Sequence, residues 1–339
     1  MKKYEPRSGD SIIDGSPPLP YPDGWFCLGF SAELRPGSVM TRPFMGEDVV
    51  LYRTHNGELR AVRPYCPHLG AHLGVGGKVV DETIVCPFHK FAFDSKGTCV
   101  ATPNNTPPTA VRLDTHPVEE INGIIYVWHH HGGTPPAWHI PALPDSGFTA
   151  PVHQLYELST HPQEICENVV DYDHIKSLHR SDWEESSPIE TDGPFLIVNL
   201  RITTPKLPVI GALFVDQSTR VAGLGAIMTE TRFLRRKVTS RLWLLPTPIA
   251  PWRVHFRLAM SSTVDRGSWP LPDRMGKHLA TVLAGAGSRV GLTAVVKLDR
   301  VDFPIWNHKL YQSPPKLAKS DGPIGLYRHW ARQFYPTVQ

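Results

Sequence analysis

The hydrophobic positions divide the chain into two β-rich halves. Between residues 24 and 131 the apolar runs are short and are separated by Gly, Asn and Asp, which predicts a small antiparallel β-domain. Its strands are expected at 25–29, 48–53, 59–62, 83–85, 91–94 and 123–128. After residue 150, strands are expected at 154–160, 195–203, 221–231, 237–245 and 252–261.

Two segments change from alternating to helical spacing. Residues 166–178 lose the alternation, and residues 273–301 form one long stretch with few helix breakers. The second stretch is expected to be a helix that covers a sheet. The fold class is therefore predicted to be α+β, with an N-terminal antiparallel β-domain and a C-terminal mixed domain.

Proline clusters and chain length set the expected boundaries. A chain of 339 residues exceeds one ordinary core, and the richest of its proline runs between the two cores is 135–144. We expect an N-terminal tail at 1–20, a first domain at 21–134, a proline-rich linker at 135–150 and a second domain at 151–339.

Charge and hydropathy limit the partners and the location. There are 35 basic and 32 acidic residues, and the longest basic run is the triplet at 235–237, which is expected on a solvated strand or turn. Nucleic acid is therefore not an expected partner. Residues 1–15 carry two lysines without an apolar segment behind them, and no uninterrupted apolar stretch has the length of a membrane span. A cytoplasmic location is expected, with peripheral membrane contact left open.

Two short motifs pair a cysteine with a histidine. Cys66 and His68 form one pair, and Cys86 and His89 form the other. In a Rieske [2Fe–2S] centre two thiolates hold one iron and two imidazoles hold the other, so each loop must present one residue of each kind. The alternative is a structural zinc site, but such sites usually pair two cysteines first and two histidines afterwards. The sequence therefore predicts a Rieske cluster.

The remaining cysteines and nearby histidines match no ligand spacing. Cys27, Cys99 and Cys166 are expected to be small core residues. His72 is expected to support the cluster loop, and the histidines at 129–131 are expected on the surface at the end of a strand.

A second group of candidate metal ligands follows in the C-terminal half. Asp171 is followed by His174 and His179, and Asn168 precedes all three. Two imidazoles and one carboxylate form the facial triad of non-haem Fe(II) oxygenases. On an ideal helix His174 and His179 would lie about 140° apart, so the helix must end or distort between them. A surface helix with two histidines is the alternative.

These motifs resemble those of Rieske non-haem iron oxygenases. CPHLGAH at 66–72 and CPFHKFAFD at 86–94 look like the Rieske domain of aromatic-ring and steroid oxygenases. Respiratory Rieske proteins carry two further cysteines, where this chain has Ala71 and Phe88. The spacing of Asp171, His174 and His179 is also that of the family, which implies that both histidines bind iron.

The C-terminal segments resemble one branch of that family. VDFPIWNHK at 301–309, with Pro304 as a departure, is similar to a segment of 3-ketosteroid 9α-hydroxylase, cholesterol 7-desaturase and aminopyrrolnitrin oxygenase, and the ending at 321–335 is similar too. The resemblance implies a helix-grip-like second domain and makes Asp302 the third iron ligand. Asp299 is the rival, and a purely structural helix cap remains open for either.

The resemblance also implies the reaction and the partners. The chain is expected to use the cluster, a mononuclear Fe(II) and O2, with electrons from a separate flavin or ferredoxin-type NAD(P)H reductase. Monooxygenation of a small hydrophobic or ring-containing substrate, such as a steroid or an aromatic natural-product intermediate, is expected first. Desaturation, arylamine N-oxygenation and a non-enzymatic electron carrier are the alternatives. Asp171 and Asn168 join the catalytic set, and Asp171 is expected to link the two metal sites across a homotrimer.

Overall fold

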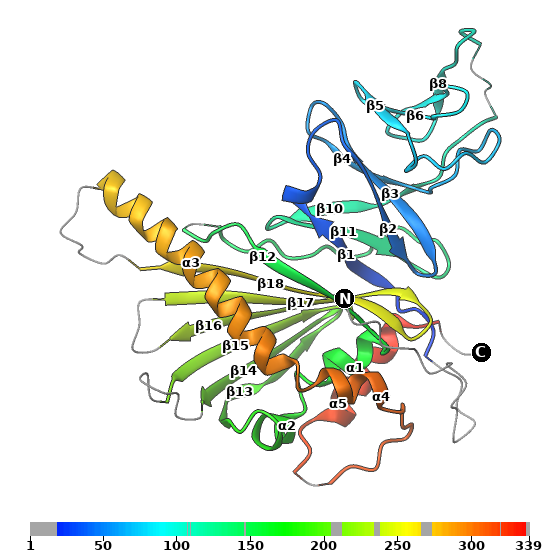
Figure 1. The fold of residues 1–339 in the computed structure, drawn as a ribbon. Helices are drawn as coiled ribbons and strands as arrows, with labels where there is room; N and C mark the ends of the chain where they lie inside the picture. The colour runs from blue at the N-terminus through cyan, green and yellow to red at the C-terminus, as the bar shows by residue number, and fades with distance from the viewer. Residues whose placement is uncertain are drawn as a thin grey trace. The chain divides into compact units, whose positions relative to one another are not determined.

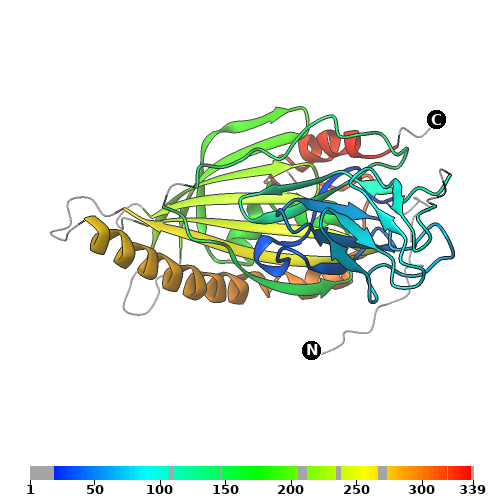
Figure 2. The ribbon, with the colours of Figure 1, turned by 90° about the horizontal axis from the view of Figure 1, so that it is seen from above.

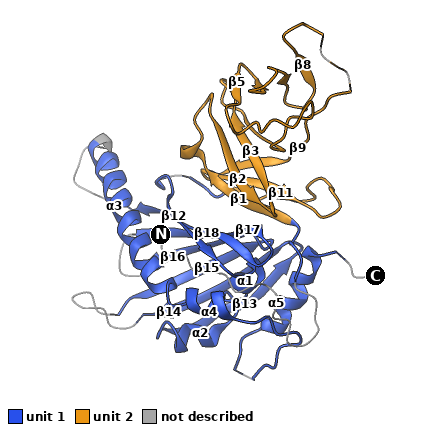
Figure 3. Cartoon of the chain, turned by 45° about the vertical axis from the view of Figure 1, so that its right-hand side comes forward, with its two compact units in different colours: residues 1–23, 143–339 blue, residues 24–142 orange. Residues whose placement is uncertain are grey.

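The chain forms two compact units, which are coloured separately in Figure 3. Unit 2 is Gly24–Ala142, and unit 1 combines Met1–Asp23 with Leu143–Gln339. The structure is a computed structural model, and it describes residues 19–106, 108, 110–145, 147–204, 212–233, 238–265, 273–318 and 320–336. The basic triplet at 235–237 lies outside these residues.

Unit 2 consists of three small antiparallel sheets, in the orders β1-β11-β10, β2-β3-β4-β9 and β5-β6-β7-β8. Its elements are β1 (Gly24–Phe30), η1 (Ser31–Glu33), β2 (Val39–Phe44), β3 (Glu47–Arg53), β4 (Leu59–Val62), β5 (Lys78–Val80), β6 (Thr83–Val85), β7 (Ala92–Phe93), β8 (Cys99–Ala101), β9 (Thr115–His116), β10 (Val118–Ile121) and β11 (Ile124–His129). All six expected strands are present. Five short strands were not predicted, because runs of two to six residues with mixed polarity carry little periodic signal.

Unit 1 contains one seven-stranded antiparallel sheet with the order β12-β18-β17-β16-β15-β14-β13. Its strands are β12 (Val152–Leu158), β13 (Asp182–Asp192), β14 (Phe195–Thr203), β15 (Phe214–Ala222), β16 (Ala226–Phe233), β17 (Val238–Ala250) and β18 (Arg253–Val264). In β14 the alternation buries Leu196, Val198 and Leu200 in the core. The strands from β13 to β18 follow one another around the sheet, which Figure 1 shows as a fan of arrows.

Helices cover one part of this sheet. They are α1 (Pro162–Glu167), α2 (Tyr172–Ser177), α3 (Asp273–Asp299), α4 (Phe303–His308), α5 (Ile324–Ala331) and the 3₁₀ turn η2 (Arg332–Phe334). The long helix α3 runs along β18, and Figure 2 shows it lying against the outside of the sheet. The α+β class and the long helix are thus confirmed.

The strands of unit 1 differ from the prediction in two places. The run 221–231 is two strands, because Gly223 adopts a positive φ of 57° and the chain turns back between β15 and β16. The segment 166–178, for which helical spacing was predicted, contains the end of α1 and all of α2. The edge strand β13 was missed because its residues are mostly polar and exposed, and register shifts interrupt its pairing with β14. Such irregular polar edges protect a sheet from pairing with other chains.

Candidate metal centres

The two cysteine–histidine loops of unit 2 have the same pattern of backbone hydrogen bonds. The Cys66 N–H donates to the Ala71 carbonyl at 2.8 Å, and the Cys86 N–H donates to the Phe91 carbonyl at the same distance. In return, the N–H groups four residues after each cysteine, at Gly70 and Lys90, donate to the cysteine carbonyls. The two loops therefore close in the same way and present their side chains alike.

The closing residue of each loop adopts a left-handed conformation. Gly70 has φ 74°, and Lys90 has φ 56° at the equivalent position. Glycine reaches this region without a steric penalty, whereas a side chain such as that of Lys90 rarely does. A strained residue that the surrounding structure holds in place is common at ligand-binding sites.

The two candidate histidine ligands of the cluster lie side by side. The rings of His68 and His89 are 4.8 Å apart between centroids at 74°, and His68 stacks on Phe91 at 4.3 Å. Nδ1 of His68 is buried and has no hydrogen-bond partner in the protein. Because buried polar atoms are nearly always paired, this nitrogen fits a metal ligand that uses Nδ1.

The cysteine pair has the matching chemistry. Burial, with Cys86 alongside, raises the pKa of the Cys66 thiol to about 11, while the N–H groups of His68 and Leu69 lower it. Iron would displace the thiol proton, since a coordinating thiol is deprotonated outright. Backbone N–H groups aimed at the sulfur would then stabilise the thiolate and adjust the potential of a cluster. The residues present therefore fit a [2Fe–2S] group.

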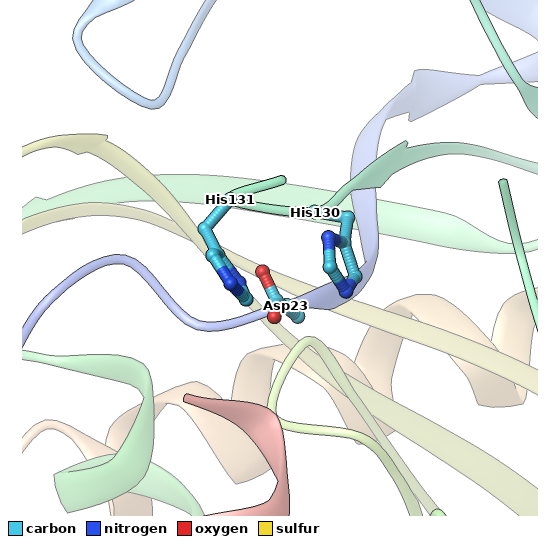
Figure 4. Close-up of side chains that lie close together, drawn as sticks. All are labelled: Asp23, His130 and His131. Carbon is cyan, nitrogen blue, oxygen red and sulfur yellow. The ribbon is translucent and has the colours of Figure 1, made fainter. Parts of the chain in front are cut away.

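The other cysteines and nearby histidines lie in different surroundings, and His131 is exposed while His129 and His130 are half-buried. Nδ1 of His72 accepts from the Gly74 N–H at 3.1 Å, and its Nε2 lies 3.5 Å from Asp48, so both ring nitrogens are used within the protein. Cys27 and Cys99 of unit 2 and Cys166 of unit 1 are buried. After the end of β11, the ring centroids of His130 and His131 lie 4.5 Å apart in a stack. Figure 4 draws both side chains.

In unit 1 three side chains from separate elements converge. His174 lies in α2, His179 follows α2, and Asp302 lies between α3 and α4. Their potential ligand atoms all lie within 4.8 Å of one another, and Nε2 of His179 is 3.4 Å from Oδ2 of Asp302. The ring centroids of the two histidines are 5.1 Å apart at 77°. This is the donor set of a 2-His-1-carboxylate iron site.

The backbone distorts between His174 and His179, as their five-residue spacing requires if both are to face one metal. Helix α2 ends at Ser177, and the His179 N–H donates to the carbonyl of His174 at 3.3 Å. A hydrogen bond across five residues is the π-type distortion that corrects the angular mismatch of an ideal helix. The predicted break between His174 and His179 is confirmed.

Hydrogen bonding and charge prepare both rings for a metal. Nδ1 of His174 is in contact with the carbonyl of Asp171, so it carries the proton and leaves Nε2 free. Burial lowers the pKa of His174, which favours the neutral imidazole that binds metals. The hydrogen bond with Asp302 raises the pKa of His179. A metal ion between these two groups would replace that proton.

The two aspartates of the C-terminal segment differ in their positions. The carboxylate of Asp302 is only 6% exposed, makes no helix-cap hydrogen bond and faces His179. Asp299 is outside the converging group. Its Oδ2 is buried without a partner, and burial, with Asp302 nearby, raises its pKa to about 7. The geometry therefore favours Asp302 as the ligand.

The remaining predicted residues surround this group. Asp171 is the N-cap of α2, and its Oδ1 accepts from the His174 N–H at 3.3 Å, while Asn168 is the C-cap of α1. The side chain of Asp171 thus makes a local helix cap, and it is half-buried. Asn168 is not part of the converging group.

Sequence reasoning missed an ionic clamp that joins the two segments of the candidate iron site. We use this name for Glu164, Glu167, Lys309 and Arg328. Nζ of Lys309 lies 2.9 Å from Glu164 and 3.3 Å from Glu167, and Arg328 donates twice to Glu167, at 2.6 and 3.0 Å. Both carboxylates are buried, at 2% and 5% side-chain exposure.

The clamp connects α1, which leads to His174, with the chain that follows Asp302. Lys309 and Arg328 stand in the C-terminal segments whose resemblance to one oxygenase branch was noted, and Glu167 begins the segment that holds both histidines. The sequence therefore pointed to these clamp residues only because they lie in segments that resemble the oxygenase branch. Nothing in the residue pattern pairs charges more than 140 positions apart.

The comparisons with known proteins cover both units. Residues 24–120 match the family described as Rieske [2Fe-2S] domain, and residues 127–335 match the 3-ketosteroid 9alpha-hydroxylase C-terminal domain. Cholesterol 7-desaturase of Bombyx mori is 33% identical, with 94% of this chain and 70% of the relative covered. The probable 3-ketosteroid-9-alpha-monooxygenase oxygenase component of Rhodococcus rhodochrous is 29% identical, with 97% and 84% covered.

A solved structure shows the same fold. Apo dicamba monooxygenase superimposes with a TM-score of 0.65 and 19% identity, and the match covers 93% of this chain and 97% of that one. The alignments span both units, and the residues of each unit fit the group that its family holds. The chain therefore belongs to the Rieske non-haem iron oxygenases, in the branch that contains cholesterol 7-desaturase and the 3-ketosteroid 9α-monooxygenase oxygenase component.

Proposed function

We propose that this oxygenase oxidises a hydrophobic, ring-containing substrate of the sterol class at an iron held by His174, His179 and Asp302. The observation that carries the proposal is the convergence of these three side chains from separate elements of unit 1. The relatives whose names specify a sterol or a ketosteroid support the substrate class. The name "oxygenase component" implies a separate reductase, and the enzyme is proposed to meet it in the cytoplasm.

The bound groups supply O2 reduction and electron delivery, and the chain supplies the environment. Monooxygenation converts R–H, O2, two electrons and two protons into R–OH and water. His174 is held as a neutral donor. His179 would become one when a metal replaces the proton that it shares with Asp302, and Asp302 would contribute the anionic ligand. In unit 2, Cys66, Cys86, His68 and His89 are the proposed cluster ligands.

The surroundings of Asp302 suit an apolar substrate. Phe303 follows it directly, and the rings of Phe303 and Trp306 lie 6.0 Å apart in a tilted stack. Phe256 of β18 contacts both rings, at 6.1 and 5.7 Å between centroids. Phe256 and Trp306 are buried in the core of unit 1 and Phe303 packs against it, so the three rings give the proposed metal site an apolar backing.

The experiment is turnover of the holoenzyme with a surrogate reductase, NADH and O2 on a panel of sterols, polycyclic aromatics and arylamines, followed by mass spectrometry. We expect sterol turnover that depends on Asp302 and is retained in the rival variant Asp299→Asn. Turnover confined to arylamines or polycyclic aromatics would contradict the proposed substrate class without affecting family membership.

Desaturation is the second candidate, because the Bombyx mori relative at 33% identity is a desaturase. A desaturation consumes the same O2, electrons and protons but forms a C=C bond and two waters. Turnover under ¹⁸O2 separates the two reactions. A product that gains one ¹⁸O atom indicates monooxygenation, whereas a product that loses two hydrogens and carries no label indicates desaturation.

We further propose that Asp171 links the iron site to the cluster of a neighbouring subunit in a homotrimer. One oxygen of its carboxylate, Oδ1, caps His174, and the link requires the second oxygen. A carboxylate between two imidazoles orients both rings, and association that closes into a ring supplies the pair. Asp171→Asn is then expected to keep both metals and dithionite reduction of the cluster but to lose most turnover. Wild-type reoxidation of the cluster in stopped flow would contradict the link, and an active monomer would contradict the trimer.

A further inference from the structure

Helix α3 carries two different apolar faces. Its inner face packs on the sheet through Ala280, Ala284, Ser288, Leu292 and Val296, which recur every four residues and are all buried. Most of these side chains are small, so the helix lies close to β18. At Gly291 an added Cβ would stand only 2.7 Å from the sulfur of Met260.

The larger apolar side chains of α3 point away from the sheet. We call them the outer face: Met275, Leu279, Val282, Leu283 and Val290, with exposures of 55%, 40%, 52%, 47% and 70%. At about 100° per residue these five positions fall within an arc of about 100°. That arc is as wide as the stripe that a surface helix usually buries. Here the stripe faces outward.

The charges around the outer face have one sign. Lys277, Arg289, Lys297 and Arg300 are exposed along α3 and directly after it. Among the described side chains from Met275 to Arg300 the single acid is Asp299, whose Oδ2 is buried next to the candidate iron site. The exposed surface of the helix is therefore apolar and cationic.

We propose that the outer face of α3 binds an anionic lipid surface, with the helix axis parallel to the membrane. A helix that combines an apolar face with Lys and Arg lies in the interface, because the apolar side chains enter the acyl boundary while the cations meet lipid phosphates. Residues Met275–Asp299 have the length and the composition of a membrane span. They cannot cross one in this fold, since the inner face of α3 is part of the core of unit 1.

This surface is separate from the metal sites and does not depend on the identity of the substrate. It would bring the enzyme to the phase in which sterol-like molecules accumulate. An exposed apolar patch of this kind otherwise marks a protein interface, so a second copy of the chain is the competing occupant. The cationic border favours phosphate-bearing lipid over a second copy of the same cationic face, because like charges would repel.

The test is flotation of the holoenzyme with vesicles of phosphatidylcholine, with and without phosphatidylglycerol. We expect binding to the anionic vesicles that weakens as salt is added. Leu283→Glu should lower the affinity more than tenfold. The matched control Thr281→Glu, which places the same charge at an exposed position of the helix outside the arc of the outer face, should have a smaller effect. Arg289→Gln with Lys297→Gln should lower the affinity for anionic vesicles about fivefold per charge removed.

Sedimentation velocity of the same variants identifies the competing occupant. Wild-type protein that fails to float with either vesicle would overturn the proposal. So would a Leu283→Glu variant that floats like the wild type but sediments as a smaller assembly, because the outer face would then be an interface between copies. An unchanged assembly together with lost flotation supports the lipid surface.

Discussion

The two candidate metal sites differ in how far apart their ligands lie in the sequence. The cluster ligands of unit 2 lie on two neighbouring loops between Cys66 and His89, each closed by its own backbone hydrogen bonds. In unit 1 the histidines and Asp302 come from distant parts of the chain and meet through long-range contacts, with the ionic clamp among them. Local backbone hydrogen bonds hold the ligands of the first site in place, whereas long-range packing in the core of unit 1 holds those of the second. Substitutions near each site should therefore act differently.

The largest effect is expected where a ligand is removed from the first of these sites. His68→Ala or His89→Ala should abolish the optical and EPR spectrum of the cluster, because one iron loses an imidazole. The mononuclear site should remain able to bind iron, since its ligands lie in the other unit. His72→Ala is the matched control and should keep the spectrum. A red-brown His68→Ala protein with an unchanged spectrum would show that the ligand assignment is wrong.

Removal of the carboxylate from the long-range site should leave the cluster untouched. Asp302→Ala is expected to lower iron occupancy at the mononuclear site and to cut turnover by more than about 100-fold, since even outer partners of metal ligands contribute 10- to 100-fold. Metal analysis should fall from about three iron to about two per chain, with labile sulfide constant at about two. If Asp299→Ala loses the iron and Asp302→Ala keeps it, the ligand is the rival.

The same contrast explains what could be predicted from sequence. Short spacings and helical periods are local features of the sequence. They allowed us to predict the candidate cluster ligands, the break after His174 and the long helix. The clamp was not predictable, because Glu167 and Arg328 meet only after the sheet and α5 have packed. β13 was missed since its stability comes from pairing with β14 rather than from its own polar residues. The sequence shows that the residues of the outer face of α3 are apolar, but only the structure shows that they are exposed.

The clamp offers a direct test of long-range positioning. Lys309→Met would leave Glu164 and Glu167 buried with one cation fewer between them. Breaking a buried ion pair typically costs about 3 to 5 kcal/mol. We expect the free energy of unfolding in urea to fall by about that amount, and iron to dissociate faster while the cluster spectrum stays constant. Lys309→Arg should restore part of both, and the exposed control Lys316→Met should change neither. Unchanged iron dissociation in Lys309→Met would assign the clamp to stability alone.

The smallest expected effect comes from a single added methyl group at the contact between the C-terminal segment and the histidine segment. A Cβ at Gly322 would lie 2.1 Å from the carbonyl oxygen of Val170 and 3.3 Å from the backbone N of Tyr172, so Gly322→Ala must displace the chain on both sides of Asp171. Overpacking of this kind costs about 1 to 3 kcal/mol. Gly325→Ala, in α5 with open space around the new methyl, is the matched control and should stabilise the helix by up to about 1 kcal/mol. Because Asp171 caps the helix that carries His174, the displacement should lower turnover in Gly322→Ala more than it lowers iron content. Equal activities in the two alanine variants would mean that the histidine segment keeps its position without this contact, and that its short local hydrogen bonds hold the site much as the loops of unit 2 hold theirs.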